Sequence, residues 1–239
     1  MCGRYSLSLG RDELEEELSE RLGCEVEVDD EHEPRYNAAP SQELPVVTSE
    51  KPDEAEHLRW GLVPRWSDDP SNTYINARAE TVDAKPAFSE AYSSRRCLVP
   101  ADGFYEWRKE GDGKKPYRFV FDGLGLMAGI YEERVPETKQ TSLEGFDETE
   151  TDDTEVVRSF VVVTTEANET VDGYHDRMSV VVPEGEEETW LHGDAEEAGS
   201  LMVPSSDEPT DVYRVSDAVN DPSNDSPEVA EPLDTRHNS

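Results

Sequence analysis

The distribution of apolar and polar residues predicts many short strands and few helices. Apolar residues run or alternate over short segments bounded by Pro, Gly and Asp, which is typical of strands separated by turns. We expect strands at residues 44–49, 55–60, 97–100, 103–108, 117–122, 126–131, 158–165 and 179–183. The segment 158–165 is rich in β-branched residues and is long enough for a central position in a sheet.

Helical periodicity is clearest near the N-terminus. Leu14, Leu18 and Leu22 recur every fourth position of RDELEEELSERL, which predicts an amphipathic helix over 11–22. We expect further helices near 76–92 and 186–203. These elements predict an α+β fold, in which one β-rich domain holds a curved, mostly antiparallel, barrel-like sheet and a few short helices.

Two segments are too polar to join this core. Residues 137–155 contain eight acidic residues and one Lys, which predicts a flexible acidic insertion between two strands. Residues 221–239 are rich in Pro, Ser, Asn and Asp, which predicts a disordered C-terminal tail. The domain itself is expected to cover residues 1–220.

Composition gives the chain an unusual surface. Its 239 residues carry a net charge of −35 and are only 34% hydrophobic, a combination that is common in disordered proteins. However, its four Trp, nine Tyr and six Phe occur in short runs bounded by Pro and Gly. This arrangement favours a packed domain with an acidic surface, as expected in the cytoplasm of an extreme halophile.

Several classes of protein are excluded. No stretch reaches the roughly 18 apolar residues that a membrane helix needs, and the N-terminus lacks the apolar region of a signal peptide. The three cysteines, Cys2, Cys24 and Cys97, are too few and too scattered for a disulfide framework or a zinc site. We therefore expect a monomeric cytoplasmic protein with reduced thiols, no metal and no cofactor.

The basic residues are concentrated in one part of the chain. Residues 59–118 hold 11 of the 22 Lys and Arg residues but only nine acidic ones. Burial of central strands, which leaves less room for acids, explains this equally well as binding of an anionic ligand. The interleaved aromatic residues are of the kind that stack on unpaired bases, as in single-strand binders: Trp60, Trp66, Tyr105 and Trp107.

Cys2 carries the most distinctive chemistry. Removal of the initiator Met would leave its α-amine and its thiol on adjacent carbons, and in peptides these groups titrate at about 7.7–8.0 and about 8.5. Such an aminothiol can condense with an aldehyde to an imine, which the thiolate then closes to a thiazolidine ring. In most proteins that begin Met-Cys, however, the cysteine is only a small residue beside the start and has no such chemical role.

Three polar residues are candidates for supporting roles. Glu106 lies among aromatic neighbours, and apolar surroundings raise the pKa of a carboxyl group toward the range that suits acid/base catalysis. His175 lies between a turn and a strand, where a structural hydrogen bond is the commoner role. Asn76 is equally explained as a helix N-cap.

The motifs in their order are more specific than any one of them. The chain reads MCGRYS, PRYNAAPSQ (34–42), LRWGLVPRW (58–66), NARAETV (76–82), RRCLVPADGFYEW (95–107), KPYRF (115–119), VVVTTEAN (161–168) and HDRMSVVV (175–182). This order resembles the SOS response-associated peptidase (SRAP) family from Met1 to about Asn220. Ser179 departs from the pattern, since the family usually has Pro after His-Asp-Arg-Met.

The resemblance implies a function and a set of site residues. Family members bind single-stranded DNA with abasic sites and attach to the lesion through the N-terminal Cys, after self-removal of the initiator Met. By resemblance, Glu106 and His175 act as acid/base groups and Asn76 positions Cys2. The resemblance also implies a DNA-contacting set, with the basic residues at phosphates and the tryptophans near the DNA path: Arg4, Arg78, Lys85, Arg177, Trp66 and Trp107.

Two other functions fit the same residues. A cysteine peptidase could use Cys2 as nucleophile, His175 as base and Glu106 as the group that orients it. A non-catalytic single-strand binder could use the basic segment 59–118 alone. A Cys2→Ser variant separates these alternatives by three readouts. It should abolish the stable DNA adduct of the first function and the cleavage of added peptides by the second, and it should leave a non-catalytic binder unchanged.

Overall fold

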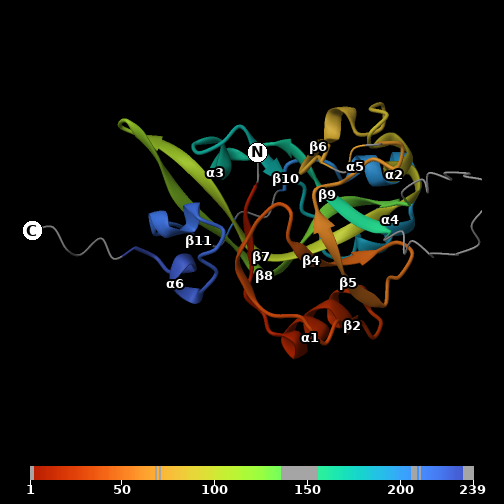
Figure 1. Ribbon diagram of the computed structural model, residues 1–239, viewed down its shortest axis with the longest axis horizontal. Coiled ribbons are helices and arrows are strands. Elements are labelled where there is room, and N and C mark those ends of the chain that lie inside the picture. The colour runs from red at the N-terminus through yellow and green to blue at the C-terminus, as the bar shows by residue number, and fades with distance from the viewer. Residues whose placement is uncertain are drawn as a thin grey trace, which may run out of the picture.

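The centre of the molecule is a sheet that closes on itself. The computed structural model describes residues 3–67, 69, 71–135, 156–205, 209 and 211–233. Neighbouring strands are hydrogen-bonded in the order β8–β9–β5–β4–β7, and β7 pairs again with β8, so these five strands form a barrel (Figure 1). Their bounds are β4 Glu43–Thr48, β5 Glu54–Trp60, β7 Arg96–Glu110, β8 Gly113–Arg134 and β9 Val157–Glu166.

Short strands extend this barrel at its edges. β1 and β3 continue the sheet from β7, β2 pairs with β5, β6 and β10 pair with β9, and β11 pairs with β8. The pairs β2–β5, β5–β9 and β6–β9 are parallel and the other pairs are antiparallel, which confirms the predicted fold class. The edge strands are β1 Tyr5–Leu7, β2 Glu27–Val28, β3 Arg35–Ala38, β6 Asn76–Arg78, β10 Arg177–Ser179 and β11 Asp211–Arg214.

The helices are short and lie around the outside of the barrel (Figure 1). The first has the predicted bounds, and its Leu14 and Leu18 are fully buried. None of the helices in the described residues is long and apolar enough to cross a membrane. The α-helices are α1 Arg11–Leu22, α2 Ser89–Ser94, α3 Glu169–Asp172, α4 Glu187–His192, α5 Ala195–Ser200 and α6 Pro227–Ala230, and the 3-10 helices are η1 Ala79–Thr81 and η2 Asp217–Asn220.

Aromatic and β-branched side chains fill the barrel. The rings of Tyr5 and Trp60 lie 5.2 Å apart between centroids, and Trp60 stacks on Phe160 of β9. β9 is buried on both faces from Ser159 to Thr165, because the barrel interior covers one face and other elements cover the other. A strand that is buried on both faces needs apolar residues at successive positions, which explains the continuous β-branched run that predicted a central strand.

Gly103 allows β7 to bend, so that one strand belongs both to the barrel and to the hairpin beyond it. The register between β7 and β8 shifts between Ala101 and Gly103, so a bulge bends the strand there. A Cβ atom at Gly103 would lie only 2.4 Å from the carbonyl oxygen of Phe119, so no other residue fits without moving the backbone. Beyond this bend, β7 and β8 continue past the barrel as a long hairpin.

Several predicted elements differ from the observed ones. The four strands expected at 97–100, 103–108, 117–122 and 126–131 merge into β7 and β8, because the bulge bends the ladder without ending it. The helix expected near 76–92 is instead β6, η1 and α2, since Asn76–Arg78 pairs with β9 and Pro86 interrupts helical bonding. The helix expected near 186–203 is divided at Gly193, where Asp194 caps a second helix.

The C-terminal segment also differs from its prediction. Residues 221–233, expected within a disordered tail, include α6 and are held by polar contacts to β3. The Asp225 carboxylate accepts hydrogen bonds from the backbone N–H groups of Tyr36 and Asn37, at 2.7 and 2.9 Å. Composition predicted disorder here because the segment is attached largely by hydrogen bonds, which a count of apolar residues does not reveal. Cys2, the insertion at 137–155 and residues 234–239 lie outside the described residues.

A buried carboxylate holds the first strand in place. Asp102 accepts hydrogen bonds from the Ser6 hydroxyl at 2.5 Å and the Ser8 backbone N–H at 2.6 Å. It also pairs with Arg118 at 2.9 Å, and both side chains are only 12% exposed. Because its partners come from β1, the chain after it and β8, Asp102 fixes β1 against the hairpin strands.

Asp102→Ala should therefore destabilise the protein strongly. The change leaves the buried Arg118 and three hydrogen-bond donors, the hydroxyl groups of Ser6 and Ser8 and the Ser8 backbone N–H, without this acceptor, which typically costs about 3–5 kcal/mol. Chemical denaturation of the variant and of Asp122→Ala, an exposed position on β8, measures the difference. A loss below about 1 kcal/mol at Asp102 would contradict the role given to this carboxylate.

Candidate functional site

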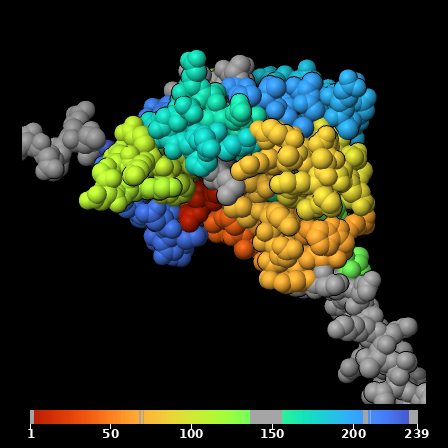
Figure 2. Space-filling model, turned by 90° about the horizontal axis from the view of Figure 1, so that it is seen from above, coloured from red at the N-terminus to blue at the C-terminus, as the bar shows by residue number. Residues whose placement is uncertain are grey.

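The first strand leads the start of the chain to one stretch of β7. Tyr5 pairs with Phe104 in antiparallel register, and the Tyr105 backbone N–H donates to the Arg4 carbonyl at 3.1 Å. Glu106 is the next residue of β7, and only Gly3 separates Arg4 from Cys2 in the sequence. Figure 2 shows the red start of the chain reaching the surface between the yellow-green hairpin and the orange-yellow segments.

Glu106 is a buried carboxyl group with a strongly shifted pKa. Its side chain lies almost wholly inside the protein, with a residue exposure of 3%. Burial raises the pKa of Glu106 to about 7, while a hydrogen bond from the Trp107 backbone and the charge of Lys114 act in the opposite direction. The carboxyl group can therefore donate or accept a proton near neutral pH.

His175 lies in the loop between α3 and β10. Its Nδ1 atom accepts a hydrogen bond from the Arg177 backbone N–H at 3.0 Å. Because a backbone N–H can only donate, this bond puts the proton of the neutral ring on Nε2. The Asp176 carboxylate lies 3.0 Å from the same Nδ1 and favours the charged ring, but burial outweighs it and lowers the pKa of His175.

Aromatic contacts connect the strand of Glu106 to the loop of His175. Glu106 pairs with Tyr117 across the hairpin, and the ring of Tyr117 meets that of Tyr174 edge-on at 4.9 Å. Tyr174 immediately precedes His175 and also packs against Phe119 at 5.0 Å. The charges of Lys114 and Asp176 act on both Glu106 and His175, so the two groups share one electrostatic environment.

Asn76 reaches this region from a different strand. β6 pairs with β9 through Val162–Thr164, and β10 pairs with β9 through Thr164–Glu166. Since Thr164 pairs with both β6 and β10, these two strands lie on either side of β9 near its C-terminal end. Asn76 is the first residue of β6, and the loop of His175 leads directly into β10, so the two residues approach this end of β9 from opposite sides.

The basic residues expected to contact DNA have different surroundings. Arg78 and Lys85 are exposed, and Arg78 and Arg177 border a hollow of about 410 Å³. Arg177 is only 11% exposed and is bound to the Glu80 carboxylate and, at 2.6 Å, to the Thr164 carbonyl. Arg4 donates to the Asn37 side chain at 2.7 Å and to the Val219 carbonyl at 2.6 Å.

The two tryptophans of that set also differ. Trp66 is 59% exposed, so its ring is accessible. Trp107 is half-buried, and its indole N–H donates to the Asn220 side chain at 2.7 Å, which ties it to the C-terminal segment. The sequence analysis did not identify a cation–π cluster beside Glu106 and His175, in which the Arg108 guanidinium lies over the rings of Tyr117 and Tyr174. All three residues stand inside or beside the quoted motifs.

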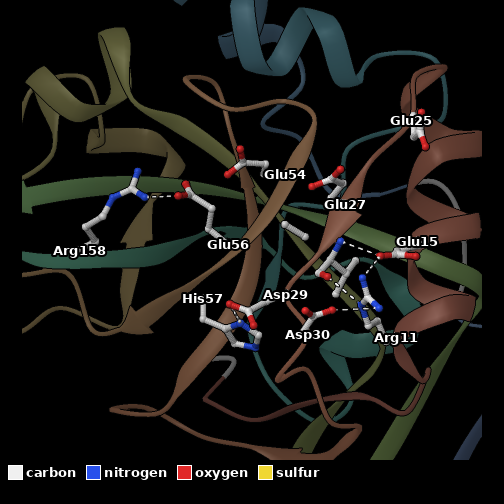
Figure 3. A pocket seen from close by; sticks show the side chains of 12 residues that line it. Arg11, Glu15, Glu25, Glu27, Asp29, Asp30, Glu54, Glu56, His57 and Arg158 are labelled. Carbon is white, nitrogen blue, oxygen red and sulfur yellow. Dashed lines mark hydrogen bonds and ion pairs between the residues drawn. The ribbon is translucent and has the colours of Figure 1, made fainter.

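A larger hollow lies elsewhere on the molecule. It measures about 680 Å³ and lies between α1, β2 and β5 (Figure 3). Acidic side chains dominate its lining, and Arg11 and Arg158 are paired with some of them. It contains none of the predicted site residues. Within the described part of the chain, no three His, Cys, Asp or Glu side chains are grouped to hold a metal ion.

Comparison with known proteins agrees with the motif order. The family described as SOS response associated peptidase (SRAP) matches residues 1–222. The Bacillus subtilis protein named abasic site processing protein YoqW is 35% identical, over 97% of this chain and 99% of its own. The Escherichia coli protein named abasic site processing protein YedK is 31% identical, over 98% and 100%.

A solved structure shares the fold. The crystal structure of a protein from Bacteroides thetaiotaomicron superposes with a TM-score of 0.79 at 26% identity, over 97% of this chain and 99% of that chain. The closed barrel and its edge strands are therefore those of an experimentally observed architecture.

Replacement of Glu106 by Gln should stabilise the protein only at high pH. The folded state keeps the Glu106 proton up to about pH 7, whereas the unfolded chain releases it near the ordinary value of 4.5. This stabilising contribution is complete below 4.5 and is lost as the pH rises through 7. Gln cannot ionise, so Glu106→Gln should gain up to about 3 kcal/mol over the parent at about pH 9, relative to their difference at about pH 4.

Thermal unfolding of both proteins across this pH range measures the effect. The exposed Glu184→Gln serves as a control, because its carboxyl group has no comparable burial. The same difference between Glu106→Gln and the parent at both ends of the range would show that Glu106 ionises normally.

Proposed function

This chain belongs to the SOS response associated peptidase (SRAP) family, and we propose that it captures abasic sites in single-stranded DNA as a covalent adduct on Cys2. The names of its relatives support the abasic site as the target. The observation that carries the proposal is the buried Glu106, whose pKa is raised to about 7, one residue beyond the backbone bond between Tyr105 and Arg4.

The proposed reaction needs no oxidant and no cofactor. The α-amine of Cys2 adds to the aldehyde carbon of the ring-opened sugar and gives a carbinolamine. Loss of one water molecule forms the imine, and the thiol sulfur then bonds to the imine carbon while its proton passes to the nitrogen. The product is a thiazolidine, and the reaction releases one water molecule.

Glu106 and His175 have the protonation states that these steps require. Burial keeps much of Glu106 protonated near pH 7, so it can donate the proton that helps the carbinolamine hydroxyl leave as water. Burial also keeps His175 neutral, so the ring can accept a proton as sulfur attacks. Reversal of the reaction uses the same groups in the opposite direction.

The other site residues have supporting roles in this proposal. Asn76 positions the N-terminal residue, the exposed Arg78 and Lys85 contact phosphates, and the exposed ring of Trp66 stacks on a base. Arg177, Arg4 and Trp107 already have partners within the protein, so their contribution includes shaping the surface. Removal of Met1 by hydrolysis of its peptide bond must precede the reaction, and we assign this step to the protein itself.

The covalent bond suits the chain's composition. Phosphate contacts typically lose about 10³–10⁵ in affinity between 50 and 200 mM salt. If the acidic surface reflects a cytoplasm rich in salt, as we propose, non-covalent capture is weak there. A thiazolidine does not dissociate with salt, so a monomeric protein could retain its lesion.

Cys2→Ser tests the chemistry of the first residue. The variant keeps the α-amine but loses the thiol, so we expect no denaturation-resistant adduct with an abasic single strand, whereas the parent forms one. Intact mass measurement should show the parent without Met1 and, after reaction, with the DNA mass less one water molecule. An active parent that retains Met1, or equal adduct from Cys2→Ser, would exclude the mechanism.

A second test addresses the acid/base groups. A positioned acid or base typically contributes about 10²–10⁴-fold. Because an aminothiol reacts unaided, we expect Glu106→Gln and His175→Ala to slow adduct formation about 10- to 100-fold without abolishing it. Each should flatten the limb of the pH–rate profile that the removed group controls.

The measurement is a single-turnover time course across pH, quenched in denaturant. Binding of an abasic analogue that lacks the aldehyde provides the control, since both variants should bind it with near-parental affinity. If their forward and reverse rates match those of the parent, the two residues are structural. Loss of peptide cleavage without any effect on DNA adducts would favour the cysteine peptidase alternative.

A further inference from the structure

The tip of the β7–β8 hairpin carries an arrangement of charge that the fold itself disfavours. Lys109 lies directly opposite Lys114 across the two strands, and the next pair toward the barrel is Arg108 opposite Lys115. Like charges that face one another across a sheet destabilise it. Two consecutive cationic pairs in a chain with 57 acidic residues therefore call for an explanation.

Only one of these two pairs is neutralised by neighbouring carboxylates. Arg108 pairs with Glu110 at 2.6 Å, and Lys115 pairs with Asp217 of η2 at 2.8 Å. Lys109 and Lys114 are both exposed, and they form no ion pair with any of the residues that the structure describes. Of the other exposed cations, Arg65 pairs with Glu90 at 2.8 Å, whereas Arg78 and Lys85 likewise have no ion pair among the described residues.

The hairpin tip projects from the body beside the candidate site. Figures 1 and 2 both show the yellow-green hairpin standing out from the barrel, next to the segment that contains α3. Three ladder positions separate the Lys109–Lys114 pair from the pair of Glu106 with Tyr117. At about 3.4 Å per residue, this is roughly 10 Å along the strand. Because side chains alternate between the two faces of a strand, Lys109 and Lys114 start from the face opposite Glu106. They lie one position from the ends of the strands, at Glu110 and Gly113, where a long side chain can extend past the tip, and the charge of Lys114 acts on both Glu106 and His175.

That spacing matches the nucleic-acid strand that the site would hold. A stacked strand rises about 3.4 Å per nucleotide, so roughly 10 Å corresponds to about three nucleotides. Directly opposed residues have Cβ atoms about 4.5–5.5 Å apart, which lets two lysine ammonium groups converge on one phosphate. The orange-yellow part of the chain, which includes β6, lies across the emerging chain start from the yellow-green hairpin (Figure 2), and Arg78 of β6 is exposed.

We propose that Lys109 and Lys114 together bind a backbone phosphate of the DNA strand within about three nucleotides of the abasic site. This inference rests on the proposed function, since it assumes that Glu106 and His175 act on a lesion in a nucleic-acid strand. It assigns to the hairpin tip the task of holding the strand on one side of the lesion, while Arg78 holds the other.

The test separates phosphate binding from the chemistry. The probe is a single strand of about 15 nucleotides with a central tetrahydrofuran abasic analogue, which lacks the aldehyde and so reports binding alone. The hairpin variant is Lys109→Gln with Lys114→Gln. The matched control is Arg11→Gln with Lys51→Gln, which changes the net charge equally beside the acidic hollow in Figure 3.

We expect the hairpin variant to lower the slope of log affinity against log salt by about 0.7 per phosphate lost. The control should keep the parental slope, and thermal unfolding should confirm that both variants are folded. A series of strands with one neutral methylphosphonate linkage at each position near the lesion locates the contact. Neutralising the contacted phosphate should weaken the parent but should not further weaken the hairpin variant.

Additive effects at every linkage, or an unchanged slope in the hairpin variant, would overturn the inference. A parent that binds the analogue strand but forms no adduct with an aldehyde-containing strand would refute the covalent function and leave the hairpin result valid. A parent that binds neither strand would overturn both.

Discussion

The position of the N-terminal strand depends on one buried carboxylate. Asp102 lies where β7 bends at Gly103, and it binds two serines of the chain's first segment and Arg118 of β8. It thereby joins β1 to the two strands that form both the barrel wall and the hairpin. This buried polar network lies only a few residues beyond Gly3, so it also fixes where the start of the described chain emerges.

Burial prepares the two acid/base candidates in complementary ways. It disfavours the charged form of both groups, so the pKa of Glu106 rises and that of His175 falls. Near pH 7, a substantial share of Glu106 therefore keeps its proton while His175 is mostly neutral. The aromatic contacts of Tyr174 hold the histidine loop against the hairpin, and the charge of Lys114 acts on both groups.

Much of this arrangement could be predicted from the sequence, and the exceptions have physical causes. The helix at 11–22 and β9 were predictable because their periodicity is strong and their burial is simple. The ordered motifs identified Glu106, His175 and Asn76 as candidates, and the described structure carries them on strands and a loop that flank one end of the barrel. Their roles remain proposals.

What the sequence did not reveal depends on long-range hydrogen bonds. Residues 221–233 have the composition of a polar tail, but they are bound to Asn37, which is far away in the sequence. The Asn37 backbone N–H donates to the Asp225 carboxylate, and its side-chain amide donates to the Asn224 carbonyl. Arg4 and Trp107 resemble free DNA contacts in the sequence, but they bind Val219 and Asn220, which immediately precede that region. Composition describes a segment by itself and therefore cannot indicate such partners.

The continuity of β7 and β8 has a consequence for how the molecule fluctuates. One hydrogen-bond ladder runs from the barrel through the bulge to the hairpin, so the strand that carries Glu106 has no hinge of its own. Local openings in proteins follow cooperative units, and here the site and the core belong to the same unit. The amides around Glu106 should thus exchange with solvent about as slowly as those of the barrel, while the hairpin tip exchanges freely.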